Sequence, residues 1–220
     1  PDADMDNAVA QLLGAAFGSS GERCMALSVA VAVGDAAADA LVSKMQTAMQ
    51  DLKVGPCTNA SNDFGPVITR QHQQKVVGFI DSAEQQGANV VVDGRNPQIE
   101  GYENGFFVGG TLIDNVTVDM DSYAAEIFGP VLQVVRVATM QQAMDIINNH
   151  EYGNGTCIFT RDGEAARYFS DQILVGMVGI NDPYLCLLPT IALVGGSAPY
   201  LAIFTPMAQM RCAFIPSEKL

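Results

Sequence analysis

A glycine- and serine-rich segment ends in the first residue that could carry covalent chemistry. Residues 17–24 read Phe-Gly-Ser-Ser-Gly-Glu-Arg-Cys, and Cys24 stands at the entry to an apolar run that predicts a buried strand. Glycine lets a backbone approach a ligand closely. A thiolate attacks carbonyl carbon, and the positive charge of Arg23 favours the thiolate form. A lone cysteine beside a strand is more often a small core residue, so this spacing alone leaves both interpretations open.

A second segment, far downstream, offers a carboxylate and an aromatic ring. The sequence Glu126-Ile127-Phe128-Gly129-Pro130 comes directly before a β-branched run, and proline is tolerated at the start of a strand. Loops at the strand ends of parallel α/β sheets are where ligands bind. Glu126 could accept hydrogen bonds from a sugar diol, and Phe128 could pack on a planar ring. The alternative is a solvated glutamate beside a packed phenylalanine.

The remaining reactive side chains form no recognisable site. The chain has two histidines, and its five cysteines are scattered with no Cys-x-x-Cys pair, so no metal site is expected. We expect His72 and His150 to be solvated on polar helix faces. Scattered thiols fit a reducing compartment, the cytoplasm or alternatively the mitochondrial matrix. No role is assigned to the other four cysteines, Cys57, Cys157, Cys186 and Cys212.

A regular alternation of helices and strands must position these side chains. Thr139 and Gln142 have the spacing of a capping box at a helix start. Strands that alternate with helices predict an α/β fold, with a mostly parallel sheet and helices on both faces. Apolar periodicity predicts helices at 5–16, 38–52, 69–86, 139–149 and 164–173, strands at 28–33, 89–92, 131–137, 156–160 and 176–181, and an extended segment at 106–113.

Composition limits the partners of the chain. Its 220 residues carry 11 basic and 24 acidic side chains, a net charge of −13. This charge disfavours binding to nucleic acid or an anionic membrane, and no apolar run is long enough to span a bilayer. Charged residues make up 16% of the chain, below the usual share of about 25%. Either another domain or subunit covers part of the surface, or the core is unusually rich in alanine and glycine.

The two ends of the chain differ from its middle. The sequence opens at Pro1 with acidic residues in a helical pattern, which predicts no signal or transit peptide and a piece of a longer polypeptide. Prolines interrupt residues 183–220, and no sustained helical or strand period is present there. We therefore expect an ordered domain at 1–182 and assign no structure to 183–220.

Taken together, these motifs resemble the catalytic domain of the aldehyde dehydrogenase superfamily. The glycine-rich loop with Cys24 and the Glu-Ile-Phe-Gly-Pro segment occur in the order of that family. The resemblance extends from residue 1 to about residue 181. Further landmarks are Phe64-Gly65-Pro66-Val67-Ile68, Tyr152-Gly153-Asn154-Gly155 and Gly176-Met177-Val178-Gly179-Ile180-Asn181.

A narrower resemblance is to the CoA-acylating methylmalonate-semialdehyde dehydrogenases. In that group an arginine directly precedes the nucleophile, as Arg23 does here, and guanidinium binds a substrate carboxylate in a bidentate fork. From the residues alone, Arg23 is also compatible with a helix-end cation or a surface ion pair. The segments that carry this resemblance are Gly21-Glu22-Arg23-Cys24-Met25-Ala26, Gly101-Tyr102-Glu103-Asn104-Gly105 and Asn154-Gly155-Thr156.

The resemblance implies a function and a set of roles. Cys24 would be the nucleophile, Arg23 would bind a small semialdehyde substrate, and Glu126 and Phe128 would bind NAD. The resemblance also implies coenzyme A as acyl acceptor, decarboxylation to an acyl-CoA, and a homo-oligomer. The family's amino-terminal NAD-binding domain has no counterpart in this sequence. The alternatives are an ordinary hydrolytic aldehyde dehydrogenase and an inactive catalytic-domain fragment.

Overall fold

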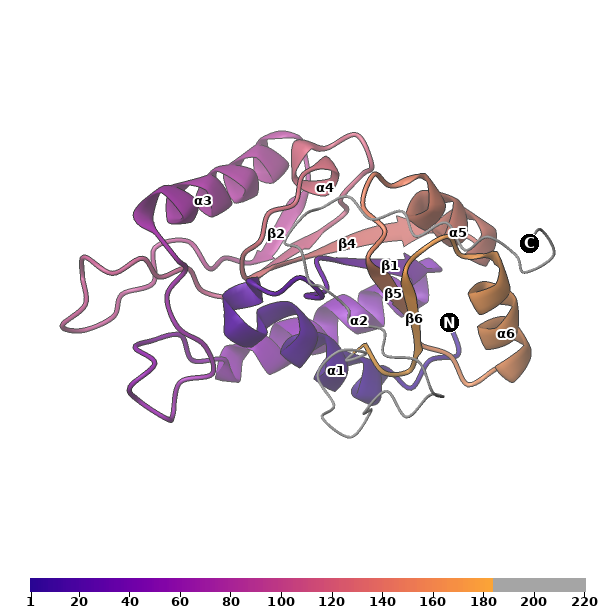
Figure 1. Ribbon diagram of the computed structural model, residues 1–220, viewed down its shortest axis with the longest axis horizontal. Coiled ribbons are helices and arrows are strands. Elements are labelled where there is room, and N and C mark those ends of the chain that lie inside the picture. Colours follow the sequence, from indigo (N-terminus) through magenta and orange to yellow (C-terminus); the bar gives the residue numbers. More distant parts are fainter. Residues whose placement is uncertain (184–220) are drawn as a thin grey trace, which may run out of the picture.

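The β-branched run at 131–137 forms the central strand of the computed structural model, which describes residues 1–183 (Figure 1). This strand, β4 (Val131–Val137), is buried at its first five positions. It pairs in parallel with β1 (Val29–Val33) on one side and with β3 (Thr111–Asp114) on the other. The edge strand β2 (Asn89–Val92) pairs with β3 in the antiparallel direction, giving the order β1-β4-β3-β2.

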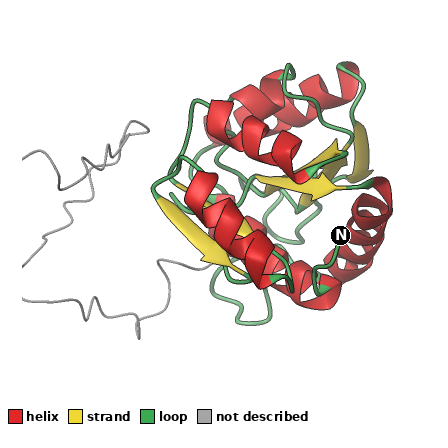
Figure 2. Cartoon of the chain, turned by 90° about the vertical axis from the view of Figure 1, so that its right-hand side faces the viewer, coloured by secondary structure: helices red, strands yellow, loops and turns green. Residues whose placement is uncertain are grey.

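Helices cover both faces of this sheet because its strands are apolar on both sides. Leu132 and Val134 of β4 pack into one cluster with α1 (Met5–Phe17) and α2 (Asp35–Ala48). Val131 and Val135, which point the opposite way, pack into a second cluster with α3 (Arg70–Gln85). The side view in Figure 2 shows the helices on either side of the strands. The predicted α/β fold is confirmed.

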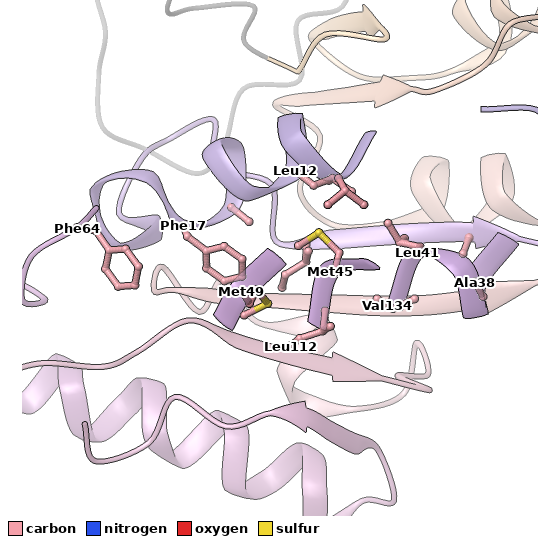
Figure 3. Packing of buried hydrophobic residues seen from close by; sticks show 13 residues of the cluster. Leu12, Phe17, Ala38, Leu41, Met45, Met49, Phe64, Leu112 and Val134 are labelled. Carbon is pink, nitrogen blue, oxygen red and sulfur yellow. The ribbon is translucent and has the colours of Figure 1, made fainter. Parts of the chain in front are cut away.

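The first cluster shows how helical spacing builds the core. Ala38, Leu41 and Met45 of α2 recur three and four positions apart and are almost fully buried. They meet Leu12 and Phe17 of α1 above the sheet (Figure 3). Each fully buried side chain of the size of leucine or methionine contributes roughly 1.5–3 kcal/mol of hydrophobic stabilisation.

The carboxyl-terminal part of the described chain adds a smaller unit beside the main sheet. The capping box predicted at Thr139 and Gln142 is present at the start of α5 (Met140–Asn149). Two short strands, β5 and β6, pair in parallel as a separate two-stranded sheet. The remaining elements are η1 (Gly18–Gly21), η2 (Met49–Asp51), α4 (Asp121–Ala124), β5 (Gly155–Ile158), α6 (Gly163–Gln172) and β6 (Met177–Ile180).

The structure corrects some of the expected element boundaries. The helix expected at 38–52 is α2, which begins three residues earlier, at Asp35, and ends at Ala48, followed by the 3-10 turn η2. The segment expected to be extended at 106–113 contains β3 from Thr111, and Gly109 before it donates its N–H to the Gly94 carbonyl at 2.8 Å. The short helix α4 was not expected. The expectations for residues 184–220, Cys186 and Cys212 among them, lie outside the described residues. Within residues 1–183, no helix is long and apolar enough to cross a membrane.

Candidate active site

The loop that leads to Cys24 has an unusual backbone. Ser19, Ser20 and Gly21 have φ angles of 54°, 60° and 69°, which is the left-handed region. Two consecutive non-glycine residues in this region store strain of the kind that clusters at functional sites. The buried hydroxyl of Ser20 donates to the carbonyl of Gly65 at 2.8 Å. This bond fixes the loop against the Phe64-Gly65-Pro66 segment.

Cys24 is exposed on a turn just after this loop. The N–H of Ala26 donates to the Arg23 carbonyl at 3.1 Å and closes the turn. Cys57 is also exposed, whereas Cys157 is partly buried, and that burial raises the pKa of its thiol to about 11. At neutral pH, the Cys157 thiol is therefore almost entirely protonated and a poor nucleophile. Cys24 is not the core residue that its position beside a strand had left open.

The Arg23 side chain folds back over the loop that precedes it. Its Nε donates to the hydroxyl oxygen of Ser19 at 3.0 Å. Its guanidinium covers Gly18, where an added Cβ would lie 2.7 Å from Nη1. Among residues 1–183, the guanidinium makes no ion pair with a carboxylate. The surface ion pair considered from the sequence is therefore not formed, and the charge of Arg23 is not neutralised by a described acidic side chain.

The second segment presents two side chains outward around one buried anchor. Ile127 is 2% exposed, and Glu126 and Phe128 on either side of it are both exposed. Phe128 is a non-glycine residue with a φ of 57°, a further strained position. An exposed carboxylate and an exposed ring two residues apart could bind a ligand that has hydroxyl groups and a planar ring.

The two segments meet at one edge of the sheet. Val29 pairs with Gln133 in the parallel β1–β4 ladder. Cys24 precedes Val29 by the same number of residues as Phe128 precedes Gln133, so the register brings both loops to the amino ends of these strands. Gly21 lies directly against Gly129, where an added Cβ would be 2.2 Å from the carbonyl oxygen. A side chain at position 21 would push the two segments apart.

His72 bridges the same two segments, which the sequence did not indicate. Its Nε2 lies 2.6 Å from the carbonyl oxygen of Phe128 and 3.4 Å from Oε1 of Glu22. Glu22 also accepts the N–H of Ile68 at 3.2 Å. The expectation that His72 is solvated is wrong, because helix α3 packs this side of the histidine against both loops. Thr69 caps α3 through the His72 N–H, but this local spacing does not predict what the imidazole contacts.

His150 is likewise a packed residue rather than a solvated one. Its Nδ1 accepts the N–H of Tyr152 at 3.1 Å, so Nε2 carries the proton that is donated to the Tyr123 carbonyl, also at 3.1 Å. The rings of Tyr123 and His150 meet edge to face at 4.8 Å. His150 thus ties the loop before β5 to the segment that carries Glu126.

The turn that carries Cys24 presents an exposed thiol, which could attack a carbonyl carbon. Within the described part of the chain, no cluster of histidine, cysteine and acidic side chains could hold a metal ion.

Asn154, from the loop before β5, donates its side-chain N–H to the carbonyl of Cys24 at 2.7 Å. Three motifs distant in the sequence therefore converge on the turn that carries the thiol.

The fold and this convergence define a member of the aldehyde dehydrogenase family. The model of that family matches residues 1–197, and the chain belongs to it. Malonate-semialdehyde dehydrogenase of Pseudomonas aeruginosa is 62% identical over 183 residues, which cover 83% of this chain and 37% of the relative. The human mitochondrial acylating methylmalonate-semialdehyde/malonate-semialdehyde dehydrogenase is 46% identical over 181 residues, covering 82% of this chain and 34% of that enzyme.

Solved structures give the same picture. Methylmalonate-semialdehyde dehydrogenase from Oceanimonas doudoroffii is 81% identical with a TM-score of 0.82, covering 83% of this chain and 38% of that one. A protein described as a methylmalonate-semialdehyde dehydrogenase from Sinorhizobium meliloti, solved with NAD, is 52% identical with the same TM-score, covering 83% of this chain and 37% of that one. This chain thus spans a little over a third of the length of these relatives.

Proposed function

We propose that this chain is the catalytic part of an NAD-dependent, CoA-acylating malonate- or methylmalonate-semialdehyde dehydrogenase. The observation that carries the proposal is the exposed Cys24 thiol with Arg23 beside it, at the same sheet edge as Glu126 and Phe128. The 62% identity to a malonate-semialdehyde dehydrogenase supports this substrate class.

Cys24 begins the reaction in this proposal. Its thiolate attacks the aldehyde carbon and forms a thiohemiacetal, while the backbone N–H of Cys24 donates to the developing oxyanion. The exposed position of the thiol on its turn leaves it accessible to a substrate. The strained loop at 19–21 and the bond from Asn154 hold that turn in place.

Arg23 selects the substrate. A guanidinium that no described carboxylate neutralises can take the distal carboxylate of a semialdehyde in a bidentate fork. Its single bond to the exposed Ser19 hydroxyl can be exchanged for two bonds to a carboxylate, in which both partners are charged. Rotation of the side chain away from Gly18 would then bring this charge to the substrate.

Glu126 and Phe128 would hold NAD. The exposed Glu126 carboxylate would accept hydrogen bonds from the ribose hydroxyls, and the exposed Phe128 ring would pack on the nicotinamide. NAD, when bound, would supply the hydride acceptor for oxidation of the thiohemiacetal on Cys24 to a thioester. Lys75 donates to the Glu126 carbonyl at 3.2 Å, and His72 holds that of Phe128, so the backbone of this segment is set before the cofactor arrives.

Coenzyme A ends the reaction. The thioester on Cys24 carries a β-carboxylate, which leaves as CO2 because the thioester carbonyl delocalises the electron pair left behind. A proton replaces the lost carboxylate, and the thiol of coenzyme A then displaces Cys24 to give the acyl-CoA. Relatives named as acylating enzymes support this acceptor.

The natural setting of this chemistry is also proposed. Three scattered free thiols in the described part of the chain fit a reducing compartment. We assign the cytoplasm, with the mitochondrial matrix as the alternative that the mitochondrial relatives suggest. The low share of charged residues, 16%, supports a homo-oligomer of the whole enzyme.

The test is product analysis on a fusion of this chain to the remaining part of the Pseudomonas relative. With malonate semialdehyde and NAD, we expect acetyl-CoA and CO2 when coenzyme A is present. A free acid formed at the same rate without coenzyme A would identify a hydrolytic aldehyde dehydrogenase. Activity that survives Cys24→Ser would refute the assigned nucleophile, and a folded but inactive fusion would identify an inactive catalytic-domain fragment.

A further inference from the structure

Asn154 and Gly155, at the start of β5, contact Cys24 and the residue after it, Met25. Asn154 donates its side-chain N–H to the Cys24 carbonyl at 2.7 Å. The next residue, Gly155, receives the side chain of Met25, because an added Cβ there would lie 2.5 Å from the Met25 Cε. Two consecutive residues of one loop therefore hold two consecutive residues of the other.

Residues 152–154, which precede β5, are themselves held in place by neighbouring segments. The N–H of Gly176 donates to the Gly153 carbonyl at 2.9 Å, and an added Cβ on Gly176 would lie 2.8 Å from the Asn154 carbonyl oxygen. The N–H of Tyr152, the residue before Gly153, donates to Nδ1 of His150. Asn154 is exposed, so its side chain contributes little to the core while reaching the nucleophile turn from a fixed base.

A bond to the Cys24 carbonyl constrains the part of the turn that the preceding loop leaves free. The left-handed residues 19–21 set the chain direction before Cys24, whereas the orientation of the Cys24–Met25 peptide depends on contacts made beyond that loop. Because the preceding loop already sets where the chain enters Cys24, holding the Cys24 carbonyl as well restricts both backbone torsions of Cys24. One of them is φ, which sets the direction of the Cys24 N–H relative to the side chain that carries the thiol. A misplacement of about 1 Å in a reacting group can cost about 100-fold in rate.

We propose that Asn154 is a positioning residue that acts through the Cys24 carbonyl, with Gly155 and Met25 as its packing support. The proposal rests on the proposed function, in which Cys24 attacks a carbonyl and its N–H stabilises the oxyanion. Asn154 touches no reacting atom. Its effect is specific for reactions at Cys24 that pass through an oxyanion.

Two probes on the 220-residue chain separate this role from a general structural one. With 4-nitrophenyl acetate, the thiolate attacks the carbonyl carbon, an oxyanion forms, and 4-nitrophenolate leaves with the electron pair of the broken C–O bond. With iodoacetamide, the thiolate displaces iodide and no oxyanion forms. We expect Asn154→Leu, which is similar in shape but has no donor, to slow acetylation of Cys24 about 10-fold more than alkylation.

The matched control removes an equivalent bond elsewhere. Gln73 donates its side-chain N–H to the Phe107 carbonyl at 2.8 Å, and Gln73→Leu should leave both rates at Cys24 unchanged. Asn154→Ala removes the same donor without adding apolar surface, so the result does not depend on the folding of one variant. Mass spectrometry of the peptides locates each adduct on Cys24 or Cys57.

The outcomes distinguish the two proposals. Preferential acetylation of Cys24 in the native chain, lost selectively in both Asn154 variants, supports the positioning role. Preferential acetylation that falls no more than alkylation in these variants overturns the role of Asn154 and leaves the proposed function intact. Acetylation of Cys24 no faster than that of Cys57 in the native chain overturns Cys24 as the nucleophile and the positioning role with it.

Discussion

At the scale of single residues, the surroundings of the three described thiols differ more than their sequence contexts. Cys24 and Cys57 are exposed, and Cys157 is partly buried with a pKa raised to about 11 by that burial. Cys57 has no charged neighbour in the sequence, whereas Cys24 follows Arg23. Accessibility and a cation that can approach the sulfur make a thiol reactive, and Cys24 alone among the three is both exposed and next to a basic residue in the sequence.

The first prediction concerns this reactivity. A limiting amount of iodoacetamide at neutral pH should label Cys24 before the other cysteines, because its thiol is exposed on the turn directly after Arg23. Peptide mapping by mass spectrometry measures the order of labelling. Cys57 is the matched comparison, since it is also exposed. Labelling of Cys57 with Cys24 untouched would contradict the assignment.

The second prediction tests Arg23 as the selector of the substrate. In the fusion to the remaining part of the Pseudomonas relative, Arg23→Leu should lower kcat/KM for malonate semialdehyde. The loss of transition-state stabilisation should be roughly 2–5 kcal/mol, the cost of removing one partner of a charged pair. Propanal, which has no carboxylate, should lose much less. Arg23→Lys should recover only part of the loss because an ammonium is not a planar fork. Equal losses for both aldehydes would show that Arg23 acts on the thiolate instead.

The third prediction assigns Glu126 to the cofactor rather than to the fold. In the same fusion, Glu126→Gln should weaken NAD binding by roughly 1–3 kcal/mol, the range for hydrogen bonds to a charged group. The Tm without NAD should stay the same, because the side chain is exposed. Titration calorimetry and a thermal melt measure the two quantities. A lower Tm with unchanged NAD affinity would make Glu126 a structural residue.

At the scale of elements, the site is a consequence of strand register. Parallel pairing of β1 and β4 brings the loops before them to one edge, and Gly21 and Gly129 let their backbones touch. Because backbone atoms make this contact, there is no space between the loops for a side chain at position 21. The bridge from His72 then adds a third element, α3, to the same contact.

The sequence predicts the elements better than it predicts these contacts. The strand at 131–137 and the capping box at Thr139 are confirmed, since both depend on local periodicity and spacing. The antiparallel pairing of β2 and the separate β5–β6 sheet were not foreseen, because strand order depends on tertiary packing. The bonds of His72 and Asn154 join segments far apart in the chain, so no local pattern predicts them.

The fourth prediction tests the contact between the two loops. Gly21→Ala should destabilise the chain by at least about 2 kcal/mol, since a left-handed alanine costs roughly 1–2 kcal/mol and its Cβ would collide with the Gly129 carbonyl. The free energy of unfolding in urea measures the loss. Gly78→Ala is the matched control, because Gly78 lies in α3 with open space around it and should gain roughly 0.5–1 kcal/mol. A neutral Gly21→Ala would show that the loops are not held in contact.

At the scale of the whole molecule, the first residues are tied to the smaller β5–β6 unit. The Asp2 carboxylate accepts the Thr160 hydroxyl at 2.6 Å and the backbone N–H groups of Arg161 and Asp162 at 2.8 and 3.1 Å. The Thr160 bond contributes most, and with the backbone bonds it lowers the pKa of Asp2 from 3.8 to about 2. One carboxylate thus links the segment before α1 to the turn between β5 and α6.

The fifth prediction follows from the sign of this shift. A carboxyl whose pKa is lower in the folded state stabilises the fold above its unfolded-state pKa, near 3.8, and this stabilisation is lost as the pH falls toward 2.

Because the Asp2 side chain is 46% exposed, solvent screening should limit the effect at pH 7 to about 1 kcal/mol or less. Asp2→Asn should therefore lower the free energy of unfolding by that amount at pH 7, and the difference from the native chain should shrink as the pH falls from about 4 through about 2. Asp145→Asn makes the same change in net charge on an exposed face of α5 and serves as the control. A difference between Asp2→Asn and the native chain that persists unchanged at pH 2 would show that the carboxylate charge does not hold the amino-terminal segment in place.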